Sequence, residues 1–135
     1  MASTINAEIL AIGTELLIGN IINTNARFLS EELAGIGVNV LYHTVCGDNP
    51  ARLTACLETA FSRVDTVITS GGLGPTADDL TKETIAAFFG RKLVLHEPSK
   101  KRIEDFFLRI HTEMADCNLK QAMMPENCIV LDNDW

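Results

Sequence analysis

A glycine-rich segment is the clearest candidate for chemistry in this sequence. Residues 70–79 read Ser-Gly-Gly-Leu-Gly-Pro-Thr-Ala-Asp-Asp. Three glycines within four residues expose backbone N–H groups and allow a positive φ, which is how a loop holds a phosphate or another oxyanion. The alternative is a tight strand-to-helix turn that binds no ligand. The residues that we predict to contact an anionic ligand here are Ser70, Gly71, Gly72, Gly74 and Thr76.

Two adjacent carboxylates close this segment. Asp78 and Asp79 would repel a bound phosphate unless a cation lies between them, so we predict that they hold Mg²⁺ or a similar hard ion. Asp79 is also a candidate general base toward a water molecule or a hydroxyl group. The alternative is helix capping, because an Asp near a first helical turn accepts hydrogen bonds from the free amides there. Lys82 follows in the first turn of the next helix, either as a contact for the anionic ligand or as a solvated side chain.

Glycine and polar side chains also follow the first apolar run, residues 7–12. Gly13, Thr14 and Glu15 come directly after this run, and Asn25 lies further along the same connection. We predict that these four residues contact the ligand. For Glu15 the alternative is a carboxylate that is simply solvated.

A third polar loop follows the apolar run at residues 38–45. Asn49 is placed to cap the next helix, because Pro50 suits the first helical turn. Asp48 is therefore less needed as a cap, and we predict that it has a catalytic role.

The apolar runs alternate with amphipathic segments, a pattern that predicts parallel strands joined by crossover helices. Strands are predicted at residues 7–12, 38–45 and 64–69. In an open parallel sheet, ligands bind outside the carboxyl ends of the strands, where loops and helix N-termini converge. We therefore predict an α/β fold with a mostly parallel sheet. The loops predicted to meet at one edge of it are residues 13–25, 47–49 and 70–79.

The second half of the sequence predicts further helices around short strands. The predicted elements are a helix over residues 81–89 ended by Gly90, a strand at 92–95, a helix opened by Pro98 and Ser99, a short helix at 119–124 stopped by Pro125, and a last apolar, strand-like run at 128–131. The helix opened by Pro98 and Ser99 carries Ile103, Phe106, Phe107 and Ile110 at helical spacing. We predict that the six Phe residues lie mostly in the core.

Composition and charge exclude several classes of protein. The 135 residues are 47% apolar and 21% charged, which fits one globular domain over residues 1–135. A net charge of −7 provides no broad cationic surface for nucleic acid. No apolar run approaches the roughly 20 residues of a membrane span, so we expect a cytoplasmic protein with no membrane partner.

The four cysteines show no metal-binding spacing. Cys46, Cys56, Cys117 and Cys128 form no CxxC pair, and the three histidines have no ligand spacing with them. We therefore predict buried, free thiols.

Four stretches of the sequence carry a resemblance to a known family. They are residues 13–19 (Gly-Thr-Glu-Leu-Leu-Ile-Gly) with 23–25 (Asn-Thr-Asn), residues 45–49 (Val-Cys-Gly-Asp-Asn), residues 71–76 (Gly-Gly-Leu-Gly-Pro-Thr) with 78–83 (Asp-Asp-Leu-Thr-Lys-Glu), and Lys120-Gln121-Ala122 with Pro125. They resemble the molybdopterin-binding-like domain of molybdenum cofactor biosynthesis proteins. The similarity is greater to the N-terminal domain of the competence/damage-inducible (CinA) proteins. Ser70 departs mildly from the family's usual Thr.

The resemblance implies a three-layer α/β sandwich, an anion or nucleotide site at residues 71–76, and acidic functional residues at Asp48 and Asp79. It implies hydrolysis of the ADP-ribose pyrophosphate with a divalent cation such as Mg²⁺, Mn²⁺ or Co²⁺. The alternatives are a module that binds or adenylylates molybdopterin, and a catalytically silent oligomerisation domain. Because family members continue past residue 135, we expect a domain truncated at its C-terminus, with only part of the family's pocket. The family tendency and an uncovered edge at residues 128–131 predict a homo-oligomer.

Overall fold

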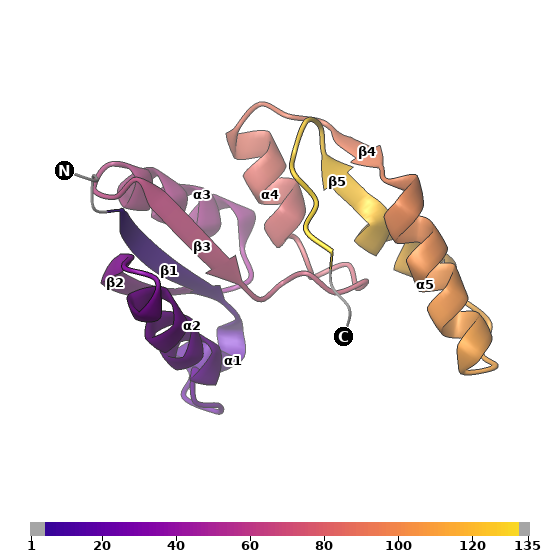
Figure 1. The fold of residues 1–135 in the computed structure, drawn as a ribbon, viewed down its shortest axis with the longest axis horizontal. Helices are drawn as coiled ribbons and strands as arrows, with labels where there is room; N and C mark the ends of the chain where they lie inside the picture. Colours follow the sequence, from indigo (N-terminus) through magenta and orange to yellow (C-terminus); the bar gives the residue numbers. More distant parts are fainter. Residues whose placement is uncertain (1–4, 133–135) are drawn as a thin grey trace. The chain divides into compact units, whose positions relative to one another are not determined.

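The computed structural model describes residues 5–132 and divides the chain into two compact units. The first unit extends to Gly72, and the second begins at Leu73 (Figure 1). Each unit has its own sheet. The prediction of a single domain over residues 1–135 stays a prediction, and the expectation about the C-terminal end falls on residues 133–135, outside the described residues. No helix within residues 5–132 combines the length and the apolar character needed to cross a bilayer.

The first unit contains a parallel sheet of three strands in the order β2-β1-β3. These strands are β1 (Asn6–Ile12), β2 (Asn39–Cys46) and β3 (Thr66–Ser70). They confirm the three predicted strands, with ends that differ by one or two residues. The order places β1 in the centre, so the loops after β2 and β3 flank the loop after β1.

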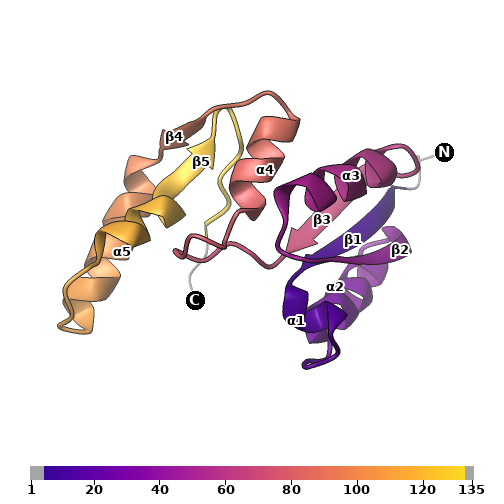
Figure 2. The ribbon, with the colours of Figure 1, turned by 180° about the vertical axis from the view of Figure 1, so that it is seen from behind.

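Helices cover both faces of this sheet. After the short α1 (Thr14–Leu17), α2 (Thr24–Gly35) lies on one face and α3 (Pro50–Phe61) on the other, as Figures 1 and 2 show from opposite sides. This arrangement is the three-layer sandwich that the resemblance implies. The Asn49 side chain accepts a hydrogen bond from the Arg52 N–H at 3.1 Å. The predicted cap of α3 is therefore confirmed.

The core of the first unit is built on β1. Every residue of β1 from Ala7 to Ile12 is buried, as expected for a parallel strand covered on both faces. Leu53 and Leu57 of α3 are buried with it, at 2% and 1% exposure. This buried strand gives the loop at its carboxyl end a rigid support.

One charged side chain lies within that core. The Glu8 side chain is 1% exposed, and its carboxylate accepts hydrogen bonds from Arg63 Nε at 2.9 Å, Arg63 Nη2 at 2.8 Å and the Thr44 hydroxyl at 2.5 Å. The hydrogen bond from Arg63 lowers the pKa of Glu8 against the opposing effect of burial. The Arg63 guanidinium also lies 3.8 Å from the centre of the Tyr42 ring. No pattern in the sequence predicts this ion pair.

A bulge between β1 and β2 makes the ion pair geometrically consistent. Ala7 pairs with Val40 but Glu8 pairs with Tyr42, so Leu41 has no partner on β1. Paired residues point to the same face of a sheet, and a shift of one residue exchanges the faces. The bulge therefore brings Tyr42 to the same face as Glu8.

The second unit contains a smaller antiparallel sheet and two longer helices. Its elements are α4 (Thr81–Phe88), β4 (Leu93–Leu95), α5 (Glu97–Arg109), the 3-10 helix η1 (Asp116–Ala122) and β5 (Met123–Pro125). Val94 of β4 pairs with Met124 of β5. The predicted helix at residues 81–89 and strand at 92–95 are confirmed.

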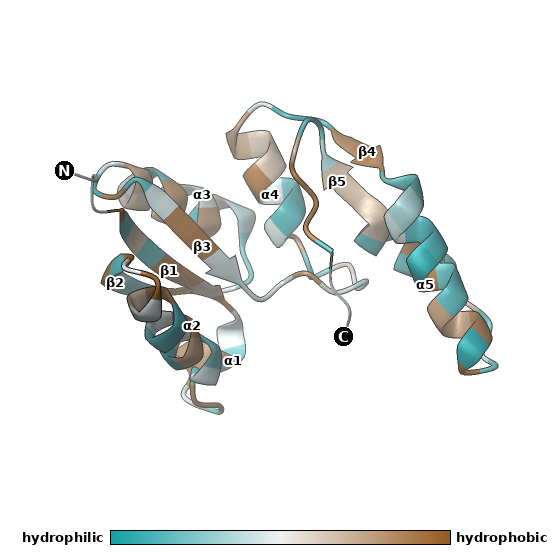
Figure 3. Cartoon of the chain, viewed as in Figure 1, coloured by the Kyte–Doolittle hydropathy of each residue, from teal (hydrophilic) through white to brown (hydrophobic). Residues whose placement is uncertain are grey.

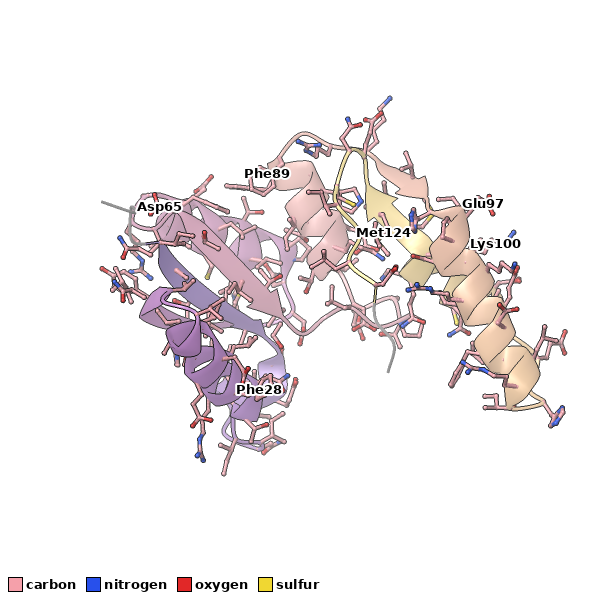
Figure 4. All side chains as sticks on the ribbon, in the orientation of Figure 1. Phe28, Asp65, Phe89, Glu97, Lys100 and Met124 are labelled. Carbon is pink, nitrogen blue, oxygen red and sulfur yellow. The ribbon has the colours of Figure 1, made fainter. Side chains whose placement is uncertain are left out.

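The last part of the second unit differs from the prediction. The predicted helix at residues 119–124 ends at Ala122, and Met124 belongs to β5 (Figure 4). The Ala122 carbonyl accepts a hydrogen bond from the His96 N–H at 2.9 Å, which draws the chain alongside β4. The prediction of a strand at residues 128–131 is wrong, because the pairing with β4 has already been made by residues 123–125.

Helix α5 begins earlier than predicted and buries no residue. Its cap is His96, whose ring nitrogen accepts a hydrogen bond from the Ser99 N–H at 3.3 Å, and Pro98 lies in the first turn. Figure 3 shows a mainly hydrophilic helix with apolar patches. Phe106 is 47% exposed on α5, and Phe28 is 60% exposed on α2 (Figure 4).

The prediction that the Phe residues lie in the core is therefore wrong, since none of the six is fully buried. Helical periodicity identifies an apolar face but not what covers it. In the second unit the fully buried residues are few and small, namely Thr81, Thr84, Ala86 and Ala122.

All four cysteines are free, as predicted, but they differ in burial. Cys46 is buried and Cys56 is half-buried, whereas Cys117 and Cys128 are exposed. The prediction of buried thiols is wrong for the latter two, because they belong to segments with few covering elements. Burial raises the pKa of the Cys46 thiol to about 11.

Candidate functional site

The loops after β1 and β2 are joined by a reciprocal pair of hydrogen bonds. The Thr14 N–H donates to the Asp48 carboxylate at 2.9 Å, and the Asp48 N–H donates to the Thr14 hydroxyl oxygen at 3.3 Å. The Gly13 N–H also donates to the Cys46 carbonyl at 2.9 Å. The predicted candidates Gly13, Thr14 and Asp48 are therefore adjacent at the carboxyl end of the sheet.

The loop after β3 is joined to the same edge. The Asn25 side-chain amide donates to the Ser70 hydroxyl oxygen at 3.2 Å, although 45 residues separate them in the sequence. The predicted convergence is thus confirmed for the loops after β1 and β2 and for the start of the third loop, at Ser70 and Gly71. Residues 73–79 of the third loop belong to the second unit.

Gly71 places the backbone of this loop directly against the end of β1. Its φ is +99°, and a Cβ at this position would lie 1.9 Å from the Ile12 carbonyl oxygen. Real Cβ atoms essentially never come within 3.0 Å of a neighbouring heavy atom. Only glycine can occupy this position without moving backbone, which gives a physical reason for the first glycine of the motif.

Glu15 lies over the backbone of Gly13 in the first of these loops. A Cβ at Gly13 would be 2.4 Å from a carboxylate oxygen of Glu15. Glu15 itself is exposed. Of the two carboxylates at this edge, that of Asp48 is held by the Thr14 N–H, whereas Glu15 is an exposed residue of α1.

In the second unit, Asp79 organises the rest of the glycine-rich segment. Its carboxylate accepts hydrogen bonds from the Thr76 N–H at 3.0 Å and the Thr76 hydroxyl at 2.5 Å. The hydroxyl bond is the main reason why the pKa of Asp79 lies below its usual value. A Cβ on Gly74 would lie 2.6 Å from the same carboxylate oxygen. Asp79 is therefore ionised at neutral pH and closes a turn over Gly74.

The neighbouring carboxylate is in a different position. Asp78 is exposed, and within residues 5–132 its side chain takes part in no recorded hydrogen bond or ion pair. Among these residues, no group of three or more His, Cys, Asp or Glu side chains could hold a metal ion by itself. Mg²⁺ is commonly bound by one or two carboxylates together with substrate phosphates. Asp78 and the second oxygen of Asp79 fit that smaller donor set.

Lys82 contacts the protein's own backbone. Its Nζ donates to the carbonyls of Lys120 at 3.0 Å and Gln121 at 3.2 Å. Burial lowers the pKa of Lys82 below its usual value. The predicted role in ligand binding stays a prediction, and two of the three Nζ hydrogens are already donated within the second unit.

The part played by Lys120 is not evident from the sequence. Its Nζ donates to the Thr76 carbonyl at 2.7 Å and to the Asp79 carbonyl, and it lies 3.5 Å from a carboxylate oxygen of Glu83. The resemblance had marked Lys120 as part of a family-like phrase. No local signal connects it to a loop 44 residues away.

Known proteins with similar sequences and structures extend over nearly the whole chain. A relative from Acetivibrio thermocellus, named as a competence-damage inducible protein, is 60% identical over 129 residues, 96% of this chain. A CinA-like protein from Dictyoglomus turgidum is 58% identical over 128 residues, 95% of this chain. The chain spans 31% of the length of each of these relatives.

Solved structures show the same fold. The crystal structure of the protein CinA from Thermoplasma acidophilum, described as of unknown function, matches with a TM-score of 0.83 and 30% identity. The match covers 97% of this chain and 76% of that one. The tungsten cofactor synthesizing protein MoaB from Pyrococcus furiosus matches with a TM-score of 0.63 over 82% of this chain and 70% of that one. At 23% identity this second likeness shows the fold alone.

The family match agrees with these relatives. Residues 8–130 match the family described as "Probable molybdopterin binding domain". This range includes all three loops of the carboxyl edge and the segment around Lys120. The match covers most of the chain, and the chain therefore belongs to the MoCF biosynthesis family of molybdopterin-binding-like domains, with CinA-like proteins among its relatives.

Proposed function

We propose that this domain binds a phosphorylated small molecule through the loops at the carboxyl edge of its parallel sheet. The observation that carries the proposal is the joining of three loops there, through Thr14 with Asp48 and Asn25 with Ser70. Parallel sheets bind ligands at this edge because loop amides and helix N-termini supply positive partial charge. Gly71 keeps the backbone of the third loop free of side-chain bulk beside β1.

The ligand that we propose is ADP-ribose, with hydrolysis of its pyrophosphate as the reaction. In this proposal the amides of Gly71 and Gly72, in the first unit, contact the pyrophosphate oxygens, and Asp48 of the same unit acts as general base toward a water molecule. In the second unit, considered by itself, Asp78 and Asp79 would hold a divalent cation. Such a cation, when bound, would supply Lewis-acid polarisation of a phosphoryl group. The pKa of Asp79, held low by Thr76, keeps one carboxylate charged for the cation at neutral pH.

A pterin ligand is the second candidate. The family description names molybdopterin, and the structural match to MoaB supports a shared scaffold. A molybdopterin-type ligand also carries a phosphate group, so the glycine-rich segment serves both candidates. The two differ in the rest of the ligand and in the need for a hydrolytic metal.

A binding panel separates these candidates. We would titrate the protein calorimetrically with ADP-ribose, AMP, pyrophosphate and a molybdopterin precursor, each with and without Mg²⁺, Mn²⁺ or Co²⁺. Metal-dependent binding of ADP-ribose, followed by release of AMP and ribose 5-phosphate, supports the hydrolase. Binding of the pterin alone supports the second candidate. Absence of binding by every compound contradicts the proposal and favours a silent oligomerisation domain.

A matched pair of variants tests the carboxyl edge itself. Asp48→Asn keeps an oxygen that can accept the Thr14 N–H but removes the charge. Asp65→Asn removes the same charge at the opposite end of β3 (Figure 4). We expect Asp48→Asn to weaken metal-dependent binding at least tenfold, which is about 1.4 kcal/mol. Asp65→Asn should leave the affinity unchanged, and equal losses in the two variants would indicate a non-specific charge effect.

A further inference from the structure

Lys120 connects the 3-10 helix η1 to the segment before α4. Its ammonium group donates to the carbonyls of Thr76 and Asp79 and lies 3.5 Å from the Glu83 carboxylate. An ammonium group has three hydrogens to donate. Three acceptors surround Lys120, and its side chain is 24% exposed. Lys120 is therefore fully engaged within the second unit and acts on that segment.

The two carbonyls that Lys120 holds fix the direction of two backbone amides. In a trans peptide the carbonyl of one residue and the N–H of the next point in opposite directions, and the described chain contains no cis peptide. With the Thr76 and Asp79 carbonyls directed at Lys120, the N–H groups of Ala77 and Leu80 point away from it. Neither N–H takes part in a backbone hydrogen bond of the described loops. Both remain available to an oxyanion.

A second lysine also connects α4 to η1, through hydrogen bonds that it donates to the backbone of η1. Lys82, in the first turn of α4, donates to the carbonyls of Lys120 and Gln121 in η1. Lys82 thus holds backbone of η1, which carries Lys120, whereas Lys120 holds backbone of the segment that leads into α4, which carries Lys82. Together the four hydrogen bonds fix η1 against α4 and the segment before it.

The positive charge of Lys120 also compensates the carboxylate of Glu83. One oxygen of Glu83 lies near Lys120, whereas the other is buried without a hydrogen-bond partner within the described residues. A buried carboxylate is costly unless a cation is close. Removal of the Lys120 charge would therefore release the two carbonyls and leave Glu83 with Lys82 as its remaining cationic neighbour.

We propose that Lys120 is a positioning residue that orients the backbone amides of Ala77 and Leu80 for an anionic ligand. The inference rests on the proposed function for the ligand, whereas the orientation of the segment can be measured without one. Lys120 contacts backbone and Glu83, not the reacting atoms. It therefore differs from the predicted ligand contact Lys82.

The test compares four variants of the full chain with the wild-type protein, and all of the substitutions lie in the second unit. Lys120→Met removes the charge at similar length, Lys120→Arg keeps the charge, and Lys101→Met removes an exposed charge from α5 as the control. The double variant Lys120→Met/Glu83→Gln removes both members of the ion pair and serves where the single variant does not fold. Amide hydrogen exchange by NMR is read at Thr76 and Asp79, whose N–H groups are hydrogen-bonded. Calorimetry then measures the affinity for ADP-ribose and for pyrophosphate, each with Mg²⁺.

We expect Lys120→Met, or its double variant, to speed exchange at both amides at least tenfold and to weaken binding at least tenfold. Exchange in β1 should stay unchanged, and Lys120→Arg should restore most of the affinity. Weakened binding with unchanged exchange would overturn the inference, because Lys120 would then contact the ligand. Faster exchange throughout the chain would overturn it as well, because the role would be structural.

The proposed function can fail independently. If the wild-type protein binds neither probe, the proposed ligand is wrong, and the exchange result alone decides whether Lys120 orients the segment. Unchanged exchange at Thr76 and Asp79 in that case would also reject the positioning role.

Discussion

Replacement of Gly71 by Ala tests whether the close approach of the third loop to β1 is a steric requirement. The new Cβ would start 1.9 Å from the Ile12 carbonyl oxygen, and reaching 3.0 Å requires a shift of 1.1 Å between backbone atoms. Ile12 is the last residue of the buried strand β1 and cannot give way cheaply. The φ of +99° adds the strain of a side chain in the left-handed region.

The expected loss of stability is the sum of these two costs. A non-glycine residue at positive φ costs about 1–2 kcal/mol, and forced overpacking adds typically about 1–3 kcal/mol. We therefore expect Gly71→Ala to reduce the free energy of unfolding by about 2–5 kcal/mol. Gly37 is the matched control: its φ is +81°, and a Cβ there would meet nothing within 4 Å. Gly37→Ala should cost only about 1–2 kcal/mol.

Chemical denaturation followed by circular dichroism measures both values, with amide exchange of β1 to report on the first unit alone. The difference between the two variants isolates the steric cost from the conformational one. Equal losses of stability for Gly71→Ala and Gly37→Ala would refute the argument, because the contact with Ile12 would then contribute nothing.

Three further predictions concern ionisable side chains. Glu8→Gln should reduce the free energy of unfolding at neutral pH by about 3 kcal/mol, because it leaves a partly buried arginine without its carboxylate. The pKa of Glu8 is lowered in the folded protein, so its contribution is complete above the ordinary carboxyl range and is lost as the pH falls through the lowered pKa. In denaturant titrations the difference between the two proteins should therefore shrink as the pH falls below the ordinary carboxyl range and through the lowered pKa of Glu8, and a constant difference would contradict this. Asp79→Asn should change the free energy of unfolding by no more than about 1 kcal/mol but abolish metal-dependent binding or turnover. Asp78→Asn should retain more of that binding or turnover. If Asp79→Asn unfolds the protein or keeps full activity in the same assays, Asp79 has a purely structural role. Iodoacetamide should label exposed Cys128 much faster than Cys46, whose pKa is raised to about 11 by burial. Mass spectrometry of the peptides measures both labelling rates, and faster labelling of Cys46 would contradict this prediction.

The positions of the strand ends could be predicted because the evidence for them is local. Apolar runs mark β1, β2 and β3, and glycine or polar residues follow each of them at once. The cap of α3 was equally local, since Asn49 and Pro50 are adjacent. Parallel pairing then brings the three loops to one edge without further information.

The charged contacts could not be predicted, because their partners are distant in the sequence. Glu8 and Arg63 are 55 residues apart, and Lys120 and Thr76 are 44 apart. Lys82 was correctly placed in the first turn of a helix. Its partners in η1, however, became known only from the structure.

The exposed aromatic residues illustrate a different limit. Phe106 lies on an amphipathic helix, as the periodicity indicates, yet it is 47% exposed. Periodicity gives the direction in which a side chain points relative to its own helix. It contains no information on the area that neighbouring elements offer for burial.

The bulge at Leu41 provides a place where the length of the chain can change without altering the edge of the sheet. Leu41 is 51% exposed and has no partner on β1. Deletion of this one residue would leave Val40 beside Ala7 and Tyr42 beside Glu8, in regular register. The segment from Tyr42 to Asp48 would keep its pairing, and Asp48 would still reach Thr14. Insertion or loss of a residue at this point is therefore decoupled from the loops at the carboxyl edge of the sheet.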